Sequence, residues 1–214
     1  MILSYQHQFV FIKTAKTAGT SIEVFLSQHC GPQDVVTPFG RPEPGHQPRN
    51  HIGFRNHLSA AAVRDRVGAE IWANYRTFCV ERNPWDKVIS HYHFVNQRFE
   101  QGRLSWEAYL ARGRFPHNLG LYSERAADGQ RCILVDQVLH YERLNEELAP
   151  LLRGIGIPFS GRLEPRAKGQ YRVSRKPRFA YYTPAQREQV AVAFAEEISL
   201  HGYSFDDVGV GHGS

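Results

Sequence analysis

The stretch KTAKTAGTS at residues 13–21 decides the fold. The apolar segment 8–13 leads into it and, being rich in Phe, Val and Ile, is typical of a short buried strand. The amphipathic segment 20–30 follows it and is typical of a helix. A strand, a polar loop and a helix in immediate succession indicate the repeating unit of an α/β protein.

A loop in this position binds anions, because the helix after it presents backbone N–H groups without helical acceptors and the positive end of its dipole. Gly19 lets the backbone approach a ligand closely, Lys16 supplies a mobile cation, and the hydroxyl residues that follow add donors. We therefore predict a phosphate or sulfate site formed by Lys16, Thr17, Ala18, Gly19, Thr20 and Ser21. The alternative is a helix merely capped by Thr or Ser, both favoured N-cap residues.

The loop differs from the one that holds ATP or GTP in nucleoside triphosphatases. That motif is G-x-x-x-x-G-K-[ST], with the lysine directly after the second glycine. Here Lys16 precedes Gly19 by three positions, and the first glycine of the motif is missing. The sequence therefore disfavours a nucleoside triphosphatase and indicates a phosphate-like ligand that is held differently.

A second junction between a strand and a helix lies in the segment FCVERNPWD at residues 78–86. We predict a strand at 75–81 and a helix at 84–98, which Asn83 caps. At about 100° per residue, Ser90 lies on the same helix face as Asn83, so Arg82 and Ser90 face one groove. An arginine and a hydroxyl placed in this way could grip a second phosphate. The alternative is that Arg82 forms a structural ion pair.

Strands alternate with helices along the rest of the chain. Helices are expected at 58–67, 105–112, 144–153 and 184–201, a strand or strand pair at 132–139, and a long surface loop at 31–56. This alternation predicts an α/β fold with a central parallel sheet flanked by helices on both faces. The 214 residues are expected to form a single domain over 1–214.

Composition narrows the class and the location of the protein. Hydrophobic residues make up 42% of the chain and charged residues 22%, which excludes collagen-like, disordered and coiled-coil proteins. No apolar run near the start approaches the roughly 20 residues that span a bilayer. Cys30, Cys79 and Cys132 form no C-x-x-C pair. We expect a soluble, cytoplasmic protein with reduced thiols, no membrane span and no metal site.

The basic residues are concentrated in one segment. The net charge is +5, and residues 162–178 hold seven basic side chains against one acid, Glu164. A local patch on a nearly neutral body favours one docked anionic ligand over general coating of nucleic acid. The alternative is a solvated basic loop.

Together, KTAGTS at 16–21 and R-N-P-W-D-x-x-x-S at 82–90 resemble the sulfotransferases that use 3'-phosphoadenosine 5'-phosphosulfate, most closely their carbohydrate-type, family 2-like branch. The similarity continues through 135–136 and 141–144 to 181–184 and 202–205. Two positions depart from the family pattern. Ala15 stands where proline is frequent, and Glu81 stands where a smaller or apolar residue is common, but neither change removes a ligand group.

The resemblance implies a P-loop-like three-layer fold and a site for the sulfate donor. The first loop would hold the 5'-phosphosulfate, and Arg82 with Ser90 would hold the 3'-phosphate. A late loop closes over the phosphates in related enzymes, and Lys168, Arg172 and Arg175 in the basic stretch are equal candidates for that role. The product nucleotide would be adenosine 3',5'-bisphosphate. The acceptor would carry a hydroxyl group, and the family branch favours a saccharide or glycolipid.

Sulfuryl transfer also needs charge stabilisation and a base. Lys16 fits the stabilisation of the leaving phosphate, and lysine, arginine and backbone amides can carry this charge without a metal. The base must take a proton near neutral pH, which suits histidine. His57 is similar to a recurring histidine of the family and is our first candidate, and His51, six residues earlier, is the second.

Two other classes of function stay open. A small-molecule kinase would also have a phosphate loop after its first strand, but it should carry G-K-[ST], which is absent. A basic nucleic-acid-binding protein would use the stretch 162–178, but the chain has no aromatic and basic recognition motif. The sequence therefore favours a sulfotransferase and predicts no nucleic-acid partner.

Overall fold

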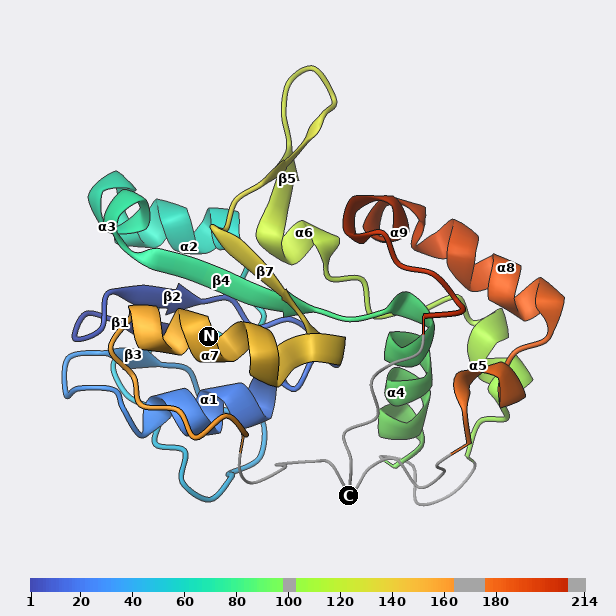
Figure 1. The fold of residues 1–214 in the computed structure, drawn as a ribbon, viewed down its shortest axis with the longest axis horizontal. Helices are drawn as coiled ribbons and strands as arrows, with labels where there is room; N and C mark the ends of the chain where they lie inside the picture. Colours follow the sequence, from blue (N-terminus) through green and yellow to red (C-terminus); the bar gives the residue numbers. More distant parts are fainter. Residues whose placement is uncertain (98–102, 164–175, 208–214) are drawn as a thin grey trace. The chain divides into compact units, whose positions relative to one another are not determined.

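The computed structural model describes residues 1–97, 103–163 and 176–207 (Figure 1). The chain divides into two compact units, each with a core of its own. The first unit comprises Met1–Glu81 and Asn118–Ala167, and the second comprises Arg82–His117 and Lys168–Ser214. The single domain over 1–214 stays a prediction.

A five-stranded mixed sheet forms the centre of the first unit, with the strand order β3-β1-β2-β4-β7 (Figure 1). The strands are β1 (Ile2–Ser4), β2 (Phe9–Phe11), β3 (Val35–Val36), β4 (Arg76–Glu81) and β7 (Gln137–His140). Strands β2, β4 and β7 are parallel, whereas β1 is antiparallel to both of its neighbours. The predicted parallel sheet is therefore wrong at β1, because a link as short as 5–8 joins only antiparallel strands.

Helices cover both faces of this sheet. They are α1 (Gly19–Ser27), α2 (Ala60–Val67), α3 (Ala69–Asn74), α6 (Leu119–Tyr122), the 3₁₀ turn η1 (Tyr141–Arg143) and α7 (Leu144–Gly154). Phe9 and Phe11 pack with α1 and α7, whereas Val10 and Ile12 pack with α2 and α6. Successive strand side chains point to opposite faces, so a strand that is apolar throughout is buried on both sides.

The predicted strand or strand pair at 132–139 belongs to two different sheets. Its second half is β7 of the main sheet, and its first half lies in a separate antiparallel hairpin (Figure 1). That hairpin consists of β5 (Ser123–Arg125) and β6 (Arg131–Ile133).

The segment 31–56 is more ordered than the predicted surface loop, and it contributes β3 to the sheet. Arg49 pairs its backbone with Val36, and its guanidinium donates to the carbonyl oxygens of Ser27, Cys30 and Gly31. These carbonyls lie at and just beyond the end of α1, where a cation is favourable. The loop therefore fastens the far end of the helix that follows the KTAGTS loop.

The second unit is helical. It contains α4 (Pro84–Asn96), α5 (Trp106–Ala111), the 3₁₀ turn η3 (Arg178–Ala180), α8 (Pro184–Ala193) and α9 (Ala195–His201). Trp85 and Val88 of α4 pack with Val190 and Phe194 in its core. The predicted helix 184–201 is interrupted at Phe194, whose φ of −116° leaves the helical range while its side chain is fully buried. Burial of this ring fixes the place where the chain turns.

Within 1–97, 103–163 and 176–207, every helix is too short or too polar to cross a lipid bilayer.

We predict that the packing of α7 on the sheet contributes substantially to stability. Leu148 is 0% exposed in the core beneath α7. Leu148→Ala should lower the free energy of unfolding by about 2–5 kcal/mol, because it removes buried methyl groups and leaves a cavity. Urea denaturation followed by circular dichroism measures the change. Ile52→Ala, at a side chain that is 94% exposed, is the control, and an equal loss there would contradict the prediction.

Candidate anion-binding site

The backbone between β2 and α1 bends through two left-handed residues. Lys16 has φ 63° and Ala18 has φ 62°, whereas Thr17 between them and Gly19 after them have negative φ. Left-handed residues in a loop before a helix occur in concave anion-binding turns, where successive N–H groups point to one ligand. Left-handed φ is unfavourable for residues with a Cβ, so the surrounding structure must hold this loop in place.

Helix α1 begins directly after this bend. Ala18 is its N-cap residue and makes no side-chain cap bond. The first N–H groups of an α-helix have no acceptor within the helix, and the helix dipole adds positive potential at this end. Thr or Ser does not occupy the N-cap position, as the alternative expected, because Ala18 is the N-cap residue. Thr20 and Ser21 are half-buried in the first turn.

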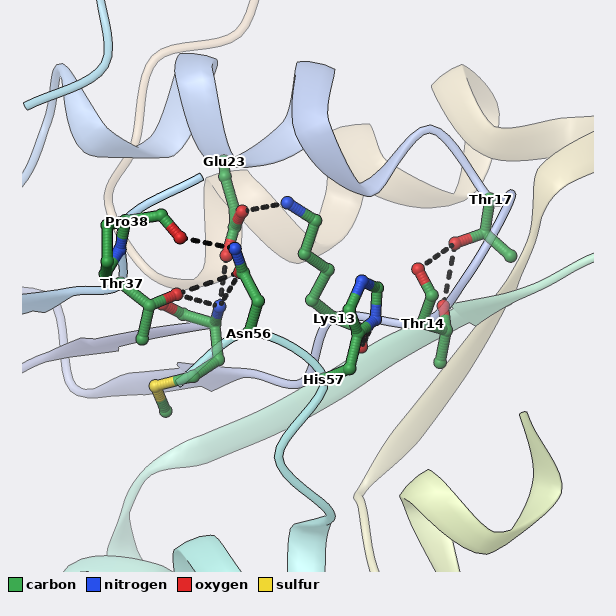
Figure 2. A network of polar contacts seen from close by, with 9 residues as sticks. Lys13, Thr14, Thr17, Glu23, Thr37, Pro38, Asn56 and His57 are labelled. Carbon is green, nitrogen blue, oxygen red and sulfur yellow. Dashed lines mark hydrogen bonds and ion pairs between the residues drawn. The ribbon is translucent and has the colours of Figure 1, made fainter. Parts of the chain in front are cut away.

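Thr17 uses its side chain inside the protein. Its Oγ1 lies 2.7 Å from Thr14 Oγ1 (Figure 2). Thr14 in turn donates to the carbonyl oxygen of Val80 in β4 at 2.5 Å. The Thr17 residue is 1% exposed. Thr17 can therefore serve an anion only through its backbone N–H, and its hydroxyl fastens the loop to the sheet.

Gly19 is required by a contact beneath the loop. A Cβ at this position would lie 2.9 Å from Cγ of Lys13 and 3.3 Å from the carbonyl oxygen of Thr14. The sequence suggests close approach to a ligand as the reason for this glycine. The structure adds the close approach of the Lys13 side chain.

The two lysines of the loop differ in their surroundings. Lys13 is buried, and its Nζ lies 2.5 Å from a carboxylate oxygen of Glu23 in α1 (Figure 2). The same Nζ lies 3.9 Å from the ring centroid of Phe39. Burial opposes the charge on Glu23, but the amino group of Met1 and Lys13 outweigh it and lower the pKa of this carboxyl group. Lys16 is only half-buried. Lys13 is thus structural, and Lys16 is the lysine suited to a ligand.

His57 reaches the loop from a distant part of the chain. Its Nδ1 lies 3.1 Å from the carbonyl oxygen of Lys13 (Figure 2). Because a carbonyl oxygen only accepts, Nδ1 carries the proton and Nε2 keeps its lone pair. Desolvation of the ring and the charge of Lys13 lower its pKa from 6.5, against a smaller opposing effect of the hydrogen bond. His57 is therefore neutral at physiological pH, with a ring nitrogen able to accept a proton.

His51 lies elsewhere in the same segment. Its carbonyl oxygen accepts the N–H of Phe54 at 2.8 Å in a local turn. Among the residues that the structure describes, no hydrogen bond or ion pair joins the His51 side chain to loop 13–21. The structure thus brings the first candidate base to the loop and not the second.

Arg82 and Ser90 belong to the second unit. Helix α4 begins at Pro84, as predicted, and carries Ser90 along its length, and both candidate residues are half-buried. Asn83, predicted to cap α4, makes no side-chain cap bond and instead donates from Nδ2 to the carbonyl oxygen of Ser204 at 2.9 Å. Arg82 thus lies just before an anchored helix start and Ser90 lies in the middle of that helix, and their role in phosphate binding stays a prediction.

The basic stretch is only partly described. Lys168 and the other two candidates for closure over the phosphates lie outside the described residues. Arg178 lies inside them and has a structural role, donating to Asp86 at 2.6 Å and to the carbonyl oxygens of Ser204 and Phe205. In the described ranges, no group of three or more His, Cys, Asp or Glu side chains is placed to hold a metal.

One residue of this site is absent from the sequence-based prediction. Asn118 lies 103 residues after Ala15, yet its side-chain amide bonds to both the N–H and the carbonyl oxygen of that residue. An asparagine directly before a helix is usually explained as an N-cap, so the sequence gives no sign of this contact.

The fold and the site define a mixed α/β protein in which a loop with two left-handed residues joins a parallel strand to the start of a helix. No family model matches the chain. It is 30% identical over 101 residues to an uncharacterized protein of Archaeoglobus fulgidus, a match that spans 47% of this chain and 84% of that protein. The chain belongs to the same family as this archaeal protein.

We predict that Glu23 makes stability depend on acidic pH. Its folded pKa is lowered from 4.5, so its contribution is present above that value and is lost as pH falls through the folded pKa. Glu23→Gln should lower the free energy of unfolding at neutral pH by about 3–5 kcal/mol, because it leaves Lys13 buried without its carboxylate.

Urea denaturation at a series of pH values from neutral to acidic measures both effects. The variant should lose less stability on acidification than the parent does. Glu70→Gln, at an exposed carboxyl group in α3, is the matched control. An unchanged acid dependence in Glu23→Gln would contradict the assignment.

Proposed function

We propose that the protein is a sulfotransferase that moves a sulfuryl group from 3'-phosphoadenosine 5'-phosphosulfate to a hydroxyl acceptor. The observation that carries this proposal is the loop, where Lys16 and Ala18 have positive φ at the start of α1 and the neutral ring of His57 is bonded to the loop backbone. An anion site with an adjacent proton acceptor suits transfer of an anionic group to a hydroxyl. The resemblance of both sequence motifs to these enzymes supports the same assignment.

A P-loop-like three-layer fold is part of the proposal. It is supported by the parallel pair β2 and β4, by the loop that links β2 to α1, and by the helices on both faces of the sheet. A cytoplasmic location is also part of it and is supported by three free thiols, those of Cys30, Cys79 and Cys132.

Each phosphate of the donor has an assigned partner in this proposal. The 5'-phosphosulfate binds the backbone and hydroxyl groups of residues 16–21, with Thr17 acting through its N–H. The 3'-phosphate binds Arg82 and Ser90, and Lys168 is one candidate for a further contact. Phosphate groups are bound by charge-assisted hydrogen bonds from arginine and by the free N–H groups at the start of a helix.

The proposed reaction is an in-line displacement at sulfur. The acceptor oxygen forms a bond to sulfur, the bond from sulfur to the 5'-phosphate oxygen breaks, and the acceptor proton passes to Nε2 of His57. The products are a sulfate ester and adenosine 3',5'-bisphosphate. Charge grows on the leaving phosphate oxygen, where Lys16 and the first amides of α1 stabilise it. Lysine and amide groups supply this stabilisation, so the step needs no metal.

The acceptor is assigned only by chemical class. The family branch that the sequence resembles favours a saccharide or glycolipid hydroxyl. A small-molecule kinase is the second candidate, because an anion-binding loop after a parallel strand also suits ATP.

We predict that the product nucleotide binds without magnesium. In calorimetry, adenosine 3',5'-bisphosphate should bind the parent equally well with and without Mg²⁺, and Arg82→Ala should weaken binding at least about tenfold, since it removes a charge-assisted contact. Magnesium-dependent binding of ATP in place of this nucleotide would favour the kinase.

We predict that Lys16→Ala reduces turnover more than it reduces nucleotide affinity, because the charge of Lys16 acts on the leaving group.

We predict that His57 sets the acidic limit of activity. Its lowered pKa means that sulfuryl transfer by the parent should decline only as pH falls below 6.5, where the ring takes up a proton. His57→Ala should lose about a hundredfold or more in turnover and lose this acidic limb, while nucleotide affinity is kept. Turnover against pH with a radiolabelled donor measures both effects. His51→Ala is the control, and a reversal of the two results would move the base to His51.

A further inference from the structure

Asn118 occupies an unusual position for an asparagine before a helix. It is the N-cap residue of α6, but its side chain makes no cap bond to that helix. It is instead 0% exposed and bonds to Ala15, directly before the KTAGTS loop. Buried side-chain amides are hydrogen-bonded, so an asparagine that does not cap its helix must have other hydrogen-bond partners.

That other partner is the backbone of Ala15, immediately before Lys16. The N–H of Ala15 donates to Oδ1 of Asn118 at 2.8 Å, and Nδ2 of Asn118 donates to the carbonyl oxygen of Ala15 at 3.1 Å. Two opposed bonds to one residue fix both the position and the rotation of its peptide groups. The next residue, Lys16, is the first left-handed residue of the loop.

Two further side chains fix the orientation of this amide. The second N–H of Asn118 Nδ2 donates to Oε1 of Glu81 at 3.2 Å, and Tyr122 donates its hydroxyl to Oε2 at 3.1 Å. Glu81 is the last residue of β4 and is fully buried, as is Tyr122. A carboxylate only accepts, so it must face the NH₂ side of the amide. The Asn118 oxygen is thereby turned to the N–H of Ala15.

We propose that Asn118, oriented by Glu81 and Tyr122, is a positioning residue that holds Ala15 so that the amides of residues 16–19 converge on an anion. The identity of that anion as the donor phosphosulfate rests on the proposed function. The geometry explains why the strained turn can persist: a backbone fixed at Ala15 and at the start of α1 leaves the residues between them little freedom.

A matched control exists in the second unit. Asn96 brackets Leu104 in the same way, with Nδ2 3.0 Å from its carbonyl oxygen and Oδ1 2.9 Å from its N–H. It is also buried, at 8% exposed. Asn96→Leu therefore removes the same two bonds and a similar buried polar group, but at a residue outside the loop.

The experiment measures anion affinity with two probes, inorganic phosphate and adenosine 3',5'-bisphosphate. The amide NMR signals of Thr17 and Gly19 report phosphate at the loop, and calorimetry reports the nucleotide. Asn118→Leu should weaken both at least about tenfold, because the fixed amides are lost. Asn96→Leu should change both by less than about twofold. Equal affinity in the parent and Asn118→Leu would overturn the proposal, as would an equal loss in Asn96→Leu.

Asn118→Asp is a second variant that keeps the test possible if Asn118→Leu does not fold. Its anion affinity is measured as a function of pH. Its carboxylate would face Glu81 and the Ala15 carbonyl without a donor, and like charges at this distance raise the pKa of an introduced carboxyl group. Relative to the parent, its affinity should recover as pH falls, because the protonated group donates again. A defect that stays constant with pH would overturn the assigned orientation of the amide.

The two probes separate this proposal from the proposed function. If the parent protein binds phosphate at the loop but does not bind the nucleotide, the proposed sulfotransferase function is contradicted. The Asn118 proposal is then still tested by comparing the phosphate affinities of the variants and the parent. A parent whose Thr17 and Gly19 amides respond to neither probe overturns both, because no anion site would then exist for Asn118 to position.

Discussion

The site depends on holding two left-handed residues, Lys16 and Ala18, in a short loop. Such backbone costs about 1–3 kcal/mol at each position and persists only when its surroundings fix it. The contacts come from several directions: the hydroxyl of Thr14 bonds to β4, Lys13 pairs with Glu23, and the ring of His57 bonds to the Lys13 carbonyl. These contacts use side chains and one carbonyl oxygen of the loop, and none of them uses an N–H group of residues 16–19.

The same contacts give chemically similar residues different roles. Lys13 and Lys16 are three positions apart, but Lys13 is buried against a carboxylate and Lys16 is half-buried. Thr14 and Thr17 use their hydroxyls internally, so the ligand groups of the proposed site are backbone amides, Lys16 and the hydroxyls of the first turn of α1. The hydrogen bond from His57 to a carbonyl fixes its tautomer, which is what a proton acceptor requires.

The two departures from the sulfotransferase pattern, at Ala15 and Glu81, meet at a single side chain. Asn118 bonds to the backbone of Ala15 and to the carboxylate of Glu81. Ala15 has an N–H to donate, which a proline would lack, and Glu81 supplies the acceptor that orients the amide. Two positions that look unrelated in the sequence therefore belong to one hydrogen-bond network, centred on Asn118, that holds the loop backbone.

The sequence by itself determined the elements whose signals are local: the apolar strand at β2, the loop before α1, and α4 with its proline at the first turn. Tertiary structure decided the addition of β1 and β3 to the sheet, the break at Phe194, and the contacts of His57 and Asn118 with the loop. The physical reason is range. Periodicity and capping act over a few residues, whereas these contacts join residues 44 and 103 positions apart and exist only once the sheet is assembled.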